Sequence, residues 1–251
     1  MDSPQLHAVG FDAPSLDSLI AAAFDAGVRG INTAPGFALI GAYSDPSGAR
    51  MAFLQRSGQQ ATTTAALVSD TPFRAQVVRF TDLLAKVALY APDGEGRLLA
   101  EFLSLVDDPV AYPQYELTGS ESTVVPALGV AALAIDVEAF SDEAAFLVSP
   151  AAELGGAAMT AATLLSPGLY ALRADAIGPG EASPTLLMAG TVVAVETRRN
   201  ALTGVDFQVA RLRSAVELTV AIPAEHPVAP GSVVYGTWFA TCSAGTWDRT
   251  A

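Results

Sequence analysis

Apolar and polar residues recur along the chain with two different periods, and each period predicts a different kind of secondary structure. Residues 16–24 place large apolar side chains three and four positions apart, as on one face of a helix. Ser15 precedes this run as an N-cap, and Gly27 follows it as a residue that ends a helix. We therefore expect a helix between Ser15 and Gly27. Residues 6–12 alternate instead, which predicts a strand.

Two turns predict β-hairpins in the first half of the chain. The turn at residues 45–48 (DPSG) separates two apolar runs, and its proline and glycine favour a tight reversal. Residues 71–90 fit both helical spacing and strand alternation, but the turn around residues 92–94 favours strands. The two hairpins share the order tyrosine, turn, arginine and apolar strand. That order indicates either an internal repeat or only the common pattern of hairpins.

The second half of the chain changes from mixed structure to strands. Residues 107–123 are polar and contain two prolines, which predicts a linker or long loop. A buried strand, a helix beginning at Ser141 and a loop at 176–184 follow. From Leu186 onward almost every segment is β-prone, and consecutive antiparallel strands must close or pack to hide their edges. A small β-barrel, OB-like or SH3-like, satisfies that requirement.

These elements predict an α+β protein of mostly antiparallel β structure with a few helices and a small C-terminal β-barrel. We expect one mixed α+β part at 1–184, with a further boundary considered near 107–123. The barrel would then occupy 185–251.

Composition excludes several classes of protein. Hydrophobic residues make up 51% of the 251 residues, charged residues only 16%, and the net charge is −13 with a single lysine, Lys86. Nucleic acids and anionic membranes attract clustered basic residues, so this acidic balance opposes both. One cysteine, Cys242, leaves no intramolecular disulfide and no cysteine-based zinc cage. The N-terminus lacks the pattern of a secretory signal, and "SPG" breaks the longest uncharged stretch, 154–172, into a buried segment and a turn. We expect a soluble cytoplasmic protein.

Short glycine-containing motifs near the C-terminus carry a resemblance. These are Gly190-Thr191-Val192-Val193, Asn200-Ala201-Leu202-Thr203-Gly204 and Pro230-Gly231-Ser232-Val233-Val234-Tyr235-Gly236. The pattern resembles the C-terminal OB-like barrel of a group of uncharacterised bacterial proteins, and it departs from that group at residues 236–239. The resemblance implies architecture and no activity. Folding alone explains the motifs, because Asn200 and Gly204 tolerate left-handed backbone and strand glycines mark bulges or barrel corners.

Residues that could carry chemistry are sparse. The chain has no phosphate-binding loop, no dinucleotide fingerprint, no H-E-x-x-H, no C-x-x-C and no G-x-S-x-G. The strand, helix and three-strand order of residues 6–68 resembles one module of the glyoxalase-like, vicinal-oxygen-chelate fold. That resemblance implies His7 as a metal ligand, with Glu101 as its carboxylate partner. A lone histidine bonded to backbone is the simpler interpretation, because the chain has two histidines in all.

The remaining acidic and sulfur-containing groups have structural interpretations. Asp107-Asp108 could act as acid–base or calcium carboxylates, but a solvated turn explains them more simply. Asp142-Glu143 has the same alternatives and fits the N-terminus of a helix. Cys242 has no basic neighbour in sequence, which predicts an inert thiol.

Arginines and aromatic residues near the C-terminus suggest a third function. Arg199, Arg211 and Trp238 are the candidate binding residues for a single-stranded nucleic acid. Residues 185–251 hold five basic and five acidic residues, however, so the whole negative charge belongs to 1–184. Cross-strand pairing with glutamates would neutralise part of the arginine cluster. This neutral balance argues against nucleic-acid binding.

The leading hypothesis is a non-enzymatic binding or interaction protein. An acidic N-terminal part suits a basic protein partner, and no catalytic constellation is evident. The alternatives are a glyoxalase-like metal-dependent enzyme that uses His7 and an OB-type nucleic-acid-binding protein. The sequence names no cofactor and no oligomeric state.

Overall fold

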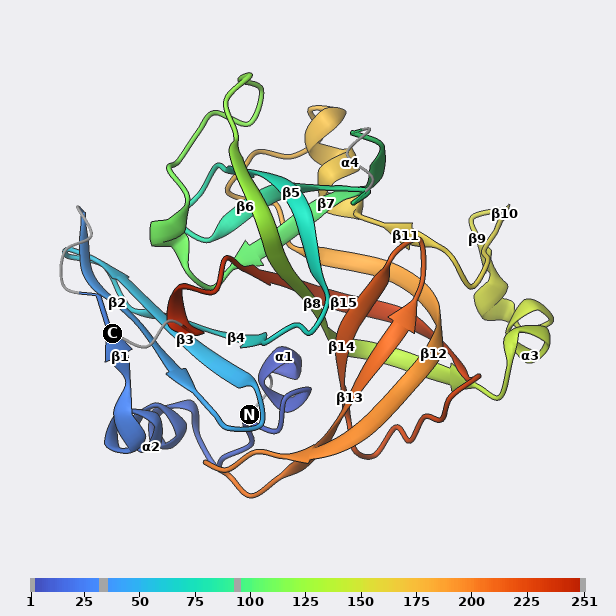
Figure 1. The fold of residues 1–251 in the computed structure, drawn as a ribbon, viewed down its shortest axis with the longest axis horizontal. Helices are drawn as coiled ribbons and strands as arrows, with labels where there is room; N and C mark the ends of the chain where they lie inside the picture. The colour runs from blue at the N-terminus through green and yellow to red at the C-terminus, as the bar shows by residue number, and fades with distance from the viewer. Residues whose placement is uncertain (1–2, 32–35, 93–95, 249–251) are drawn as a thin grey trace.

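A computed structural model of the protein describes residues 3–31, 36–92 and 96–248, and it shows two β-sheets joined by short helices and loops (Figure 1). One sheet has four strands and the other has nine, with a separate two-stranded ribbon. The expected class, mostly β structure with a few helices, is confirmed. Among the residues in the described ranges, no helix combines the length and the apolar character needed to cross a membrane.

The smaller sheet and its helices come from the N-terminal part of the chain. Its elements are α1 (Pro4–His7), α2 (Leu16–Gly27), β1 (Arg29–Gly30), β2 (Phe37–Ser44), β3 (Ala49–Arg56) and β4 (Thr62–Leu67). Helix α2 confirms the first prediction, and Ser15 and Ser18 form a reciprocal capping box at its start. Phe24 of α2 packs on Phe53 of β3 with ring centroids 5.0 Å apart. This contact holds α2 against the small sheet.

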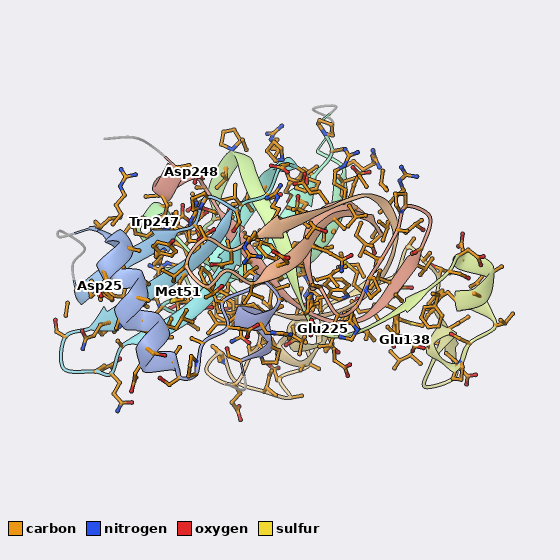
Figure 2. All side chains as sticks on the ribbon, turned by 90° about the horizontal axis from the view of Figure 1, so that it is seen from below. Asp25, Met51, Glu138, Glu225, Trp247 and Asp248 are labelled. Atoms are coloured by element: carbon orange, nitrogen blue, oxygen red, sulfur yellow. The ribbon has the colours of Figure 1, made fainter. Side chains whose placement is uncertain are left out.

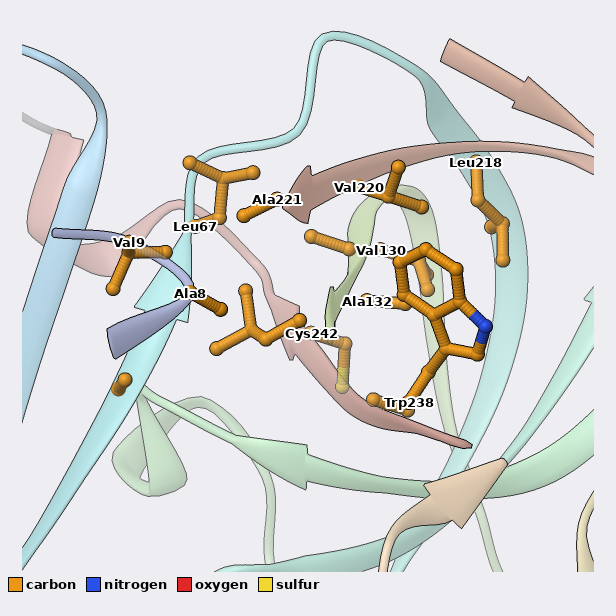
Figure 3. Close-up of a cluster of buried hydrophobic side chains, with 14 of the residues drawn as sticks. Ala8, Val9, Leu67, Val130, Ala132, Leu218, Val220, Ala221, Trp238 and Cys242 are labelled. Carbon is orange, nitrogen blue, oxygen red and sulfur yellow. The ribbon is translucent and has the colours of Figure 1, made fainter. Parts of the chain in front are cut away.

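The strand predicted at residues 6–12 is wrong. Residues Pro4–His7 form a short helix, with proline at a position where the missing N–H costs nothing. Alternation misled because Ala8, Val9 and Phe11 are all buried, whereas a strand with one solvated face would bury every second residue. Figure 3 shows Ala8 and Val9 near Leu67 of β4, at one side of the main core cluster. Residues 8–11 therefore fill part of the core.

The larger sheet contains the remaining long strands and the two-residue strand β11. They are β5 (Pro72–Arg79), β6 (Leu84–Tyr90), β7 (Leu98–Val106), β8 (Thr123–Phe140), β11 (Leu164–Leu165), β12 (Thr185–Arg199), β13 (Asp206–Arg213), β14 (Glu217–Pro223) and β15 (Val233–Ser243). Residues 71–90 are thus strands, as the hairpin signal favoured. Strands β6 and β7 pair as an antiparallel hairpin, and the turn expected at 92–94 lies mostly outside the described residues.

Two circuits of strand pairing run through this sheet. The first ring consists of β5, β6, β7, β15 and β8, and the pairing of β8 with β5 returns it to its start. The second ring consists of β12, β13, β14, β8 and β15, and the pairing of β15 with β12 returns it to its start. Each ring has one parallel contact, β7 with β15 or β14 with β8. Strands β8 and β15 belong to both rings.

The shared strands cross the expected boundary at residue 184. Strand β8 lies before it and pairs with β14 and β15, which lie after it. Figure 1 shows β8 and β15 side by side at the centre of the molecule. The division into 1–184 and 185–251 stays a prediction. A boundary at residue 184 would separate β8 from its pairing partners β14 and β15.

The main core lies where the two rings meet. Val130 and Ala132 of β8, Val220 of β14, and Trp238 and Cys242 of β15 lie together there (Figure 3). Trp238 is fully buried, and its indole N–H donates to the Met188 carbonyl at 3.2 Å. Burial raises the pKa of the Cys242 thiol, which keeps it neutral.

Short elements fill the connections between the long strands. They are η1 (Pro109–Ala111), α3 (Glu143–Leu147), η2 (Pro150–Ala152), β9 (Glu153–Leu154), β10 (Ala157–Ala158), α4 (Pro167–Arg173) and η3 (Thr246–Asp248). The helix expected after Ser141 is present, but Asp142 is its N-cap. The turn expected at "SPG" is wrong, because Pro167 begins α4 at the position where helices tolerate proline.

The turn at residues 200–204 is held by side chains. We expected a left-handed backbone at Asn200, and this is wrong, because Asp175 is the described non-glycine residue with positive φ. Asn200 is fully buried, and its side-chain amide donates to the Val9 carbonyl at 3.0 Å. The Asp45 carboxylate accepts two backbone N–H groups of the turn, at 3.0 and 3.1 Å. These hydrogen bonds attach the turn to Val9, which follows α1, and to Asp45, which lies between β2 and β3.

Gly236 gives a direct test of the close approach between β8 and β15. Its φ is +152°, and a Cβ atom at this position would lie 2.1 Å from the Asp136 carbonyl oxygen. We expect Gly236→Ala to lower the free energy of unfolding by ~3 kcal/mol or more, since backbone must move in both shared strands. Urea unfolding measures this. Gly180→Ala is the control, because nothing lies within 4 Å of a Cβ there, and a loss as large as that of Gly236→Ala would contradict the interpretation.

Candidate functional site

A cleft of about 650 Å³ lies between the end of β5, the connection from β7 to β8 and the end of α4. Ten residues line it: Phe80, Gln114, Tyr115, Glu116, Leu117, Thr118, Leu172, Asp175, Ile177 and Pro179. Its volume falls in the range typical of ligand sites in proteins. The residues come from three segments that are distant in sequence and that the fold brings together.

Arg79 positions one wall of the cleft. This buried arginine ends β5, and its Nε donates to the Tyr112 carbonyl at 2.8 Å while Nη1 donates to the Thr81 carbonyl at 2.8 Å. Burial lowers the pKa of the guanidinium. The backbone N–H of Tyr115 donates back to the Arg79 carbonyl at 2.8 Å, and Gln114 donates to the Phe80 carbonyl at 3.0 Å. These bonds hold residues 112–115 against the sheet.

The floor of the cleft is apolar and belongs to a compact cluster. Phe80 and Leu172 are buried in a cluster with Leu84, Leu103 and Leu169, and Leu117 and Ile177 pack against it. The Ser166 hydroxyl accepts the Leu103 N–H at 3.1 Å, which attaches the start of α4 to β7. A floor supported in this way is preformed, so an apolar group that enters loses little free energy to rearrangement.

Carboxylates form the charged part of the rim. Glu116 and Asp175 are exposed, and the lining includes no arginine, lysine or histidine. Asp175 has φ +52°, because it follows Ala174, the C-cap of α4, at the position where a left-handed conformation commonly ends a helix. The cleft can therefore accommodate an apolar group next to a positive charge.

The two predicted metal ligands lie in separate ion pairs. His7 is on α1, and its Nδ1 and Nε2 are 2.6 Å from Asp12 and 2.5 Å from Glu225. Burial lowers the pKa of His7, but the two carboxylates outweigh burial and the pKa is raised. Glu101 on β7 pairs with Arg173 and lies 3.9 Å from Lys86. Within the described ranges, no three histidine, cysteine, aspartate or glutamate residues are placed to hold a metal ion.

The predicted nucleic-acid residues also have protein partners. Arg199 is exposed and bonds to Asp206 at 3.1 Å, and Arg211 is 3.5 Å from Glu217. Each arginine lines a surface hollow that also includes residues of β12, and Glu196 lines both hollows. Trp238 lies in the core, so its ring is not on this surface. The structure thus does not gather the three candidate residues into one basic site.

Asp107 and Asp108 are buried, so the solvated turn expected for them is wrong. Their exposed fractions are 2% and 0%. Arg50 of β3, which is 1% exposed, donates to Asp107 at 2.6 Å and to Asp248 at 2.5 Å. Tertiary contacts explain the error. The two aspartates come directly after β7, and residues of β3 and of the C-terminal segment cover their carboxylates.

Sequence reasoning missed the cleft for a related reason. Each lining segment alone resembles an ordinary loop or helix end, and only Glu116 and Asp175 carry a full charge. The one available signal was the 75-residue interval, 98–172, in which acidic residues occur without a basic residue. That interval contributes one wall of the cleft and part of the other.

Comparisons with known proteins do not identify a relative. No protein-family model, no curated protein and no solved structure matches the chain. The geometry and charge of the cleft therefore carry the functional interpretation.

The buried ion pair predicts a large difference between two arginines. We expect Arg50→Met to lower the free energy of unfolding by ~3–5 kcal/mol, because it leaves Asp107 buried without a cation. Arg199→Met removes an exposed pair with Asp206 and should cost less than ~1 kcal/mol. Urea unfolding of both variants checks this. Equal losses would show that the Arg50 pair does not carry the stated energy.

Proposed function

We propose that the protein is a non-enzymatic binding protein and that its cleft takes an apolar segment of a basic partner protein. One observation carries this proposal: an apolar floor lies beneath carboxylates, with no basic residue in the lining. Phe80, Leu172 and Ile177 would contact the apolar part of the segment. Glu116 and Asp175 would face its positive charge.

The residues of the cleft favour binding over catalysis. Its lining has no histidine, cysteine, serine or lysine, so the side chains that most often act as nucleophiles or general bases at neutral pH do not meet there. Carboxylates at a solvated rim attract and orient a cationic partner, and the apolar floor then contributes most of the affinity.

We also propose that the second ring is a small barrel of the OB-like kind. The support is its five-stranded circuit, in which β12, β13 and β14 are consecutive and the parallel contact of β14 with β8 completes the order. The resemblance to uncharacterised bacterial proteins stays a prediction. An SH3-like description is the alternative for the same strands.

The two alternative functions have less support. The glyoxalase-like hypothesis required a first strand that carries His7, and His7 lies on a helix with both ring nitrogens near carboxylates. The nucleic-acid hypothesis required unpaired arginines, and Arg199 and Arg211 each face an acidic side chain. Metal analysis of the purified protein and a salt titration with single strands test these alternatives.

A short peptide of alternating leucine and lysine tests the proposed cleft. We expect it to bind at low ionic strength and to weaken as salt is added, whereas a leucine–glutamate peptide should not bind. The double variant Glu116→Gln, Asp175→Asn should weaken binding roughly tenfold, because two rim charges are lost. Isothermal titration calorimetry measures both effects.

The matched control is Asp17→Asn, Asp25→Asn, which removes two charges from α2, outside the cleft lining. Retention of affinity in this control, with loss in the rim variant, supports a localised site. Equal weakening in both variants would show that only the net charge attracts the peptide. Absence of binding to the unmodified protein would also contradict the proposal.

A further inference from the structure

A buried joint connects the small sheet, the end of β7 and the C-terminal segment. The joint is defined by Arg50, Asp107, Asp108 and residues 244–248. Trp247 is 5% exposed and packs against Ile40, Ala42 and Leu54 of the small sheet, which form a cluster of their own with it. Figure 2 shows Trp247 and Asp248 together at the end of the molecule that carries the small sheet.

Hydrogen bonds fasten the C-terminal segment at several points. The Trp247 indole N–H donates to the Asp107 carbonyl at 2.8 Å, and Arg29 donates to the Trp247 carbonyl at 3.2 Å. The Asp108 Oδ2 atom accepts the backbone N–H groups of Ala244 at 3.0 Å and Thr246 at 3.1 Å. Asp108 is thus the side chain that holds the beginning of this segment.

Charges in the joint do not balance. Within the described residues, the carboxylates of Asp107, Asp108 and Asp248 lie around the Arg50 guanidinium, which donates to Asp107 and Asp248. In the part of the chain that the structure describes, Asp108 forms no ion pair, and its Oδ1 atom is buried without a hydrogen-bond partner. An ionised carboxylate in that position is costly, because burial removes it from water and no described cation forms an ion pair with it.

Two further titratable groups lie near Asp108, and neither supplies a positive charge. Burial keeps the hydroxyl of Tyr112 and the thiol of Cys242 neutral by raising the pKa of each. Burial, with the Asp107 charge as the next cause, raises the pKa of Asp108 to about 6, although the N–H groups of Thr246 and Ala244 favour the ionised form. Asp107 and Asp108 interact closely, so they titrate as a pair.

We propose that Asp108 makes the joint sensitive to pH: a proton on Asp108 fastens residues 244–248 between the two sheets, and loss of that proton loosens them. The direction follows from linkage. When the segment opens, Asp108 meets water and its pKa returns toward the ordinary value of 3.8, so opening releases a proton. The open fraction therefore rises as pH increases from about 4 to about 6 and levels off above that range.

The two tryptophans provide a readout and an internal control. The chain has only Trp238 and Trp247, whose indole N–H groups donate to Met188 in the core and to Asp107 in the joint. Hydrogen exchange of both indoles is followed by NMR and expressed relative to the intrinsic rate at each pH. We expect the protection of Trp247 to fall about tenfold or more between pH 4.5 and 7.5, while that of Trp238 stays constant.

Two variants separate the role of Asp108 from a general effect of charge. Asp108→Asn keeps an acceptor for Ala244 and Thr246 and should make the protection of Trp247 independent of pH. Asp248→Asn removes the same charge from a half-exposed partner of Arg50 and should leave the pH dependence in place. Constant protection of Trp247 in the unmodified protein would overturn the proposal. Persistence of the pH dependence in Asp108→Asn would also overturn it.

A measurement on the unmodified protein covers the case in which Asp108→Asn does not fold. Carbon-13 NMR of the aspartate carboxyl groups should show one that titrates about two units above the ordinary value. Titration of every aspartate below pH 5 would overturn the proposal without any variant.

Discussion

The antiparallel pairing of β8 with β15 is the constraint on which the rest of the structure depends. It runs from Val233 opposite Phe140 to Ser243 opposite Gly129, with one register shift between Thr237 and Trp238. Both of these long strands are members of both rings. Neither circuit of strand pairing closes without both strands.

The shared pair also determines where the polar features lie. Because β7 pairs with the end of β15 and β8 begins beside β5, the connection at residues 107–122 must cross one end of the first ring. Its beginning carries Asp107 and Asp108 into the joint with Arg50. Its later part forms one wall of the cleft, and hydrogen bonds with Arg79 hold that part against the sheet. One connection therefore contributes to both the candidate binding site and the pH-sensitive joint.

Local signals in the sequence predicted local structure and little else. The capped helix α2, the hairpin of β2 and β3 and the strands in residues 71–90 depend on neighbouring residues, and all three are present. The similar hairpins considered as a repeat belong to different sheets, whereas the two rings, which do repeat a strand order, share no evident motif. The burial of Asp107 and the lining of the cleft depend on contacts distant in sequence, which periodicity cannot reveal.

The most direct test of the shared strands is equilibrium unfolding of residues 185–251 expressed alone, followed by tryptophan fluorescence and circular dichroism. This fragment contains β12 to β15 and both tryptophans but lacks β8. We expect it to show no cooperative transition, because the second ring stays open, and to gain one when residues 1–184 are added. A cooperative transition of the fragment alone would contradict the account, since it would show that the second ring closes without β8.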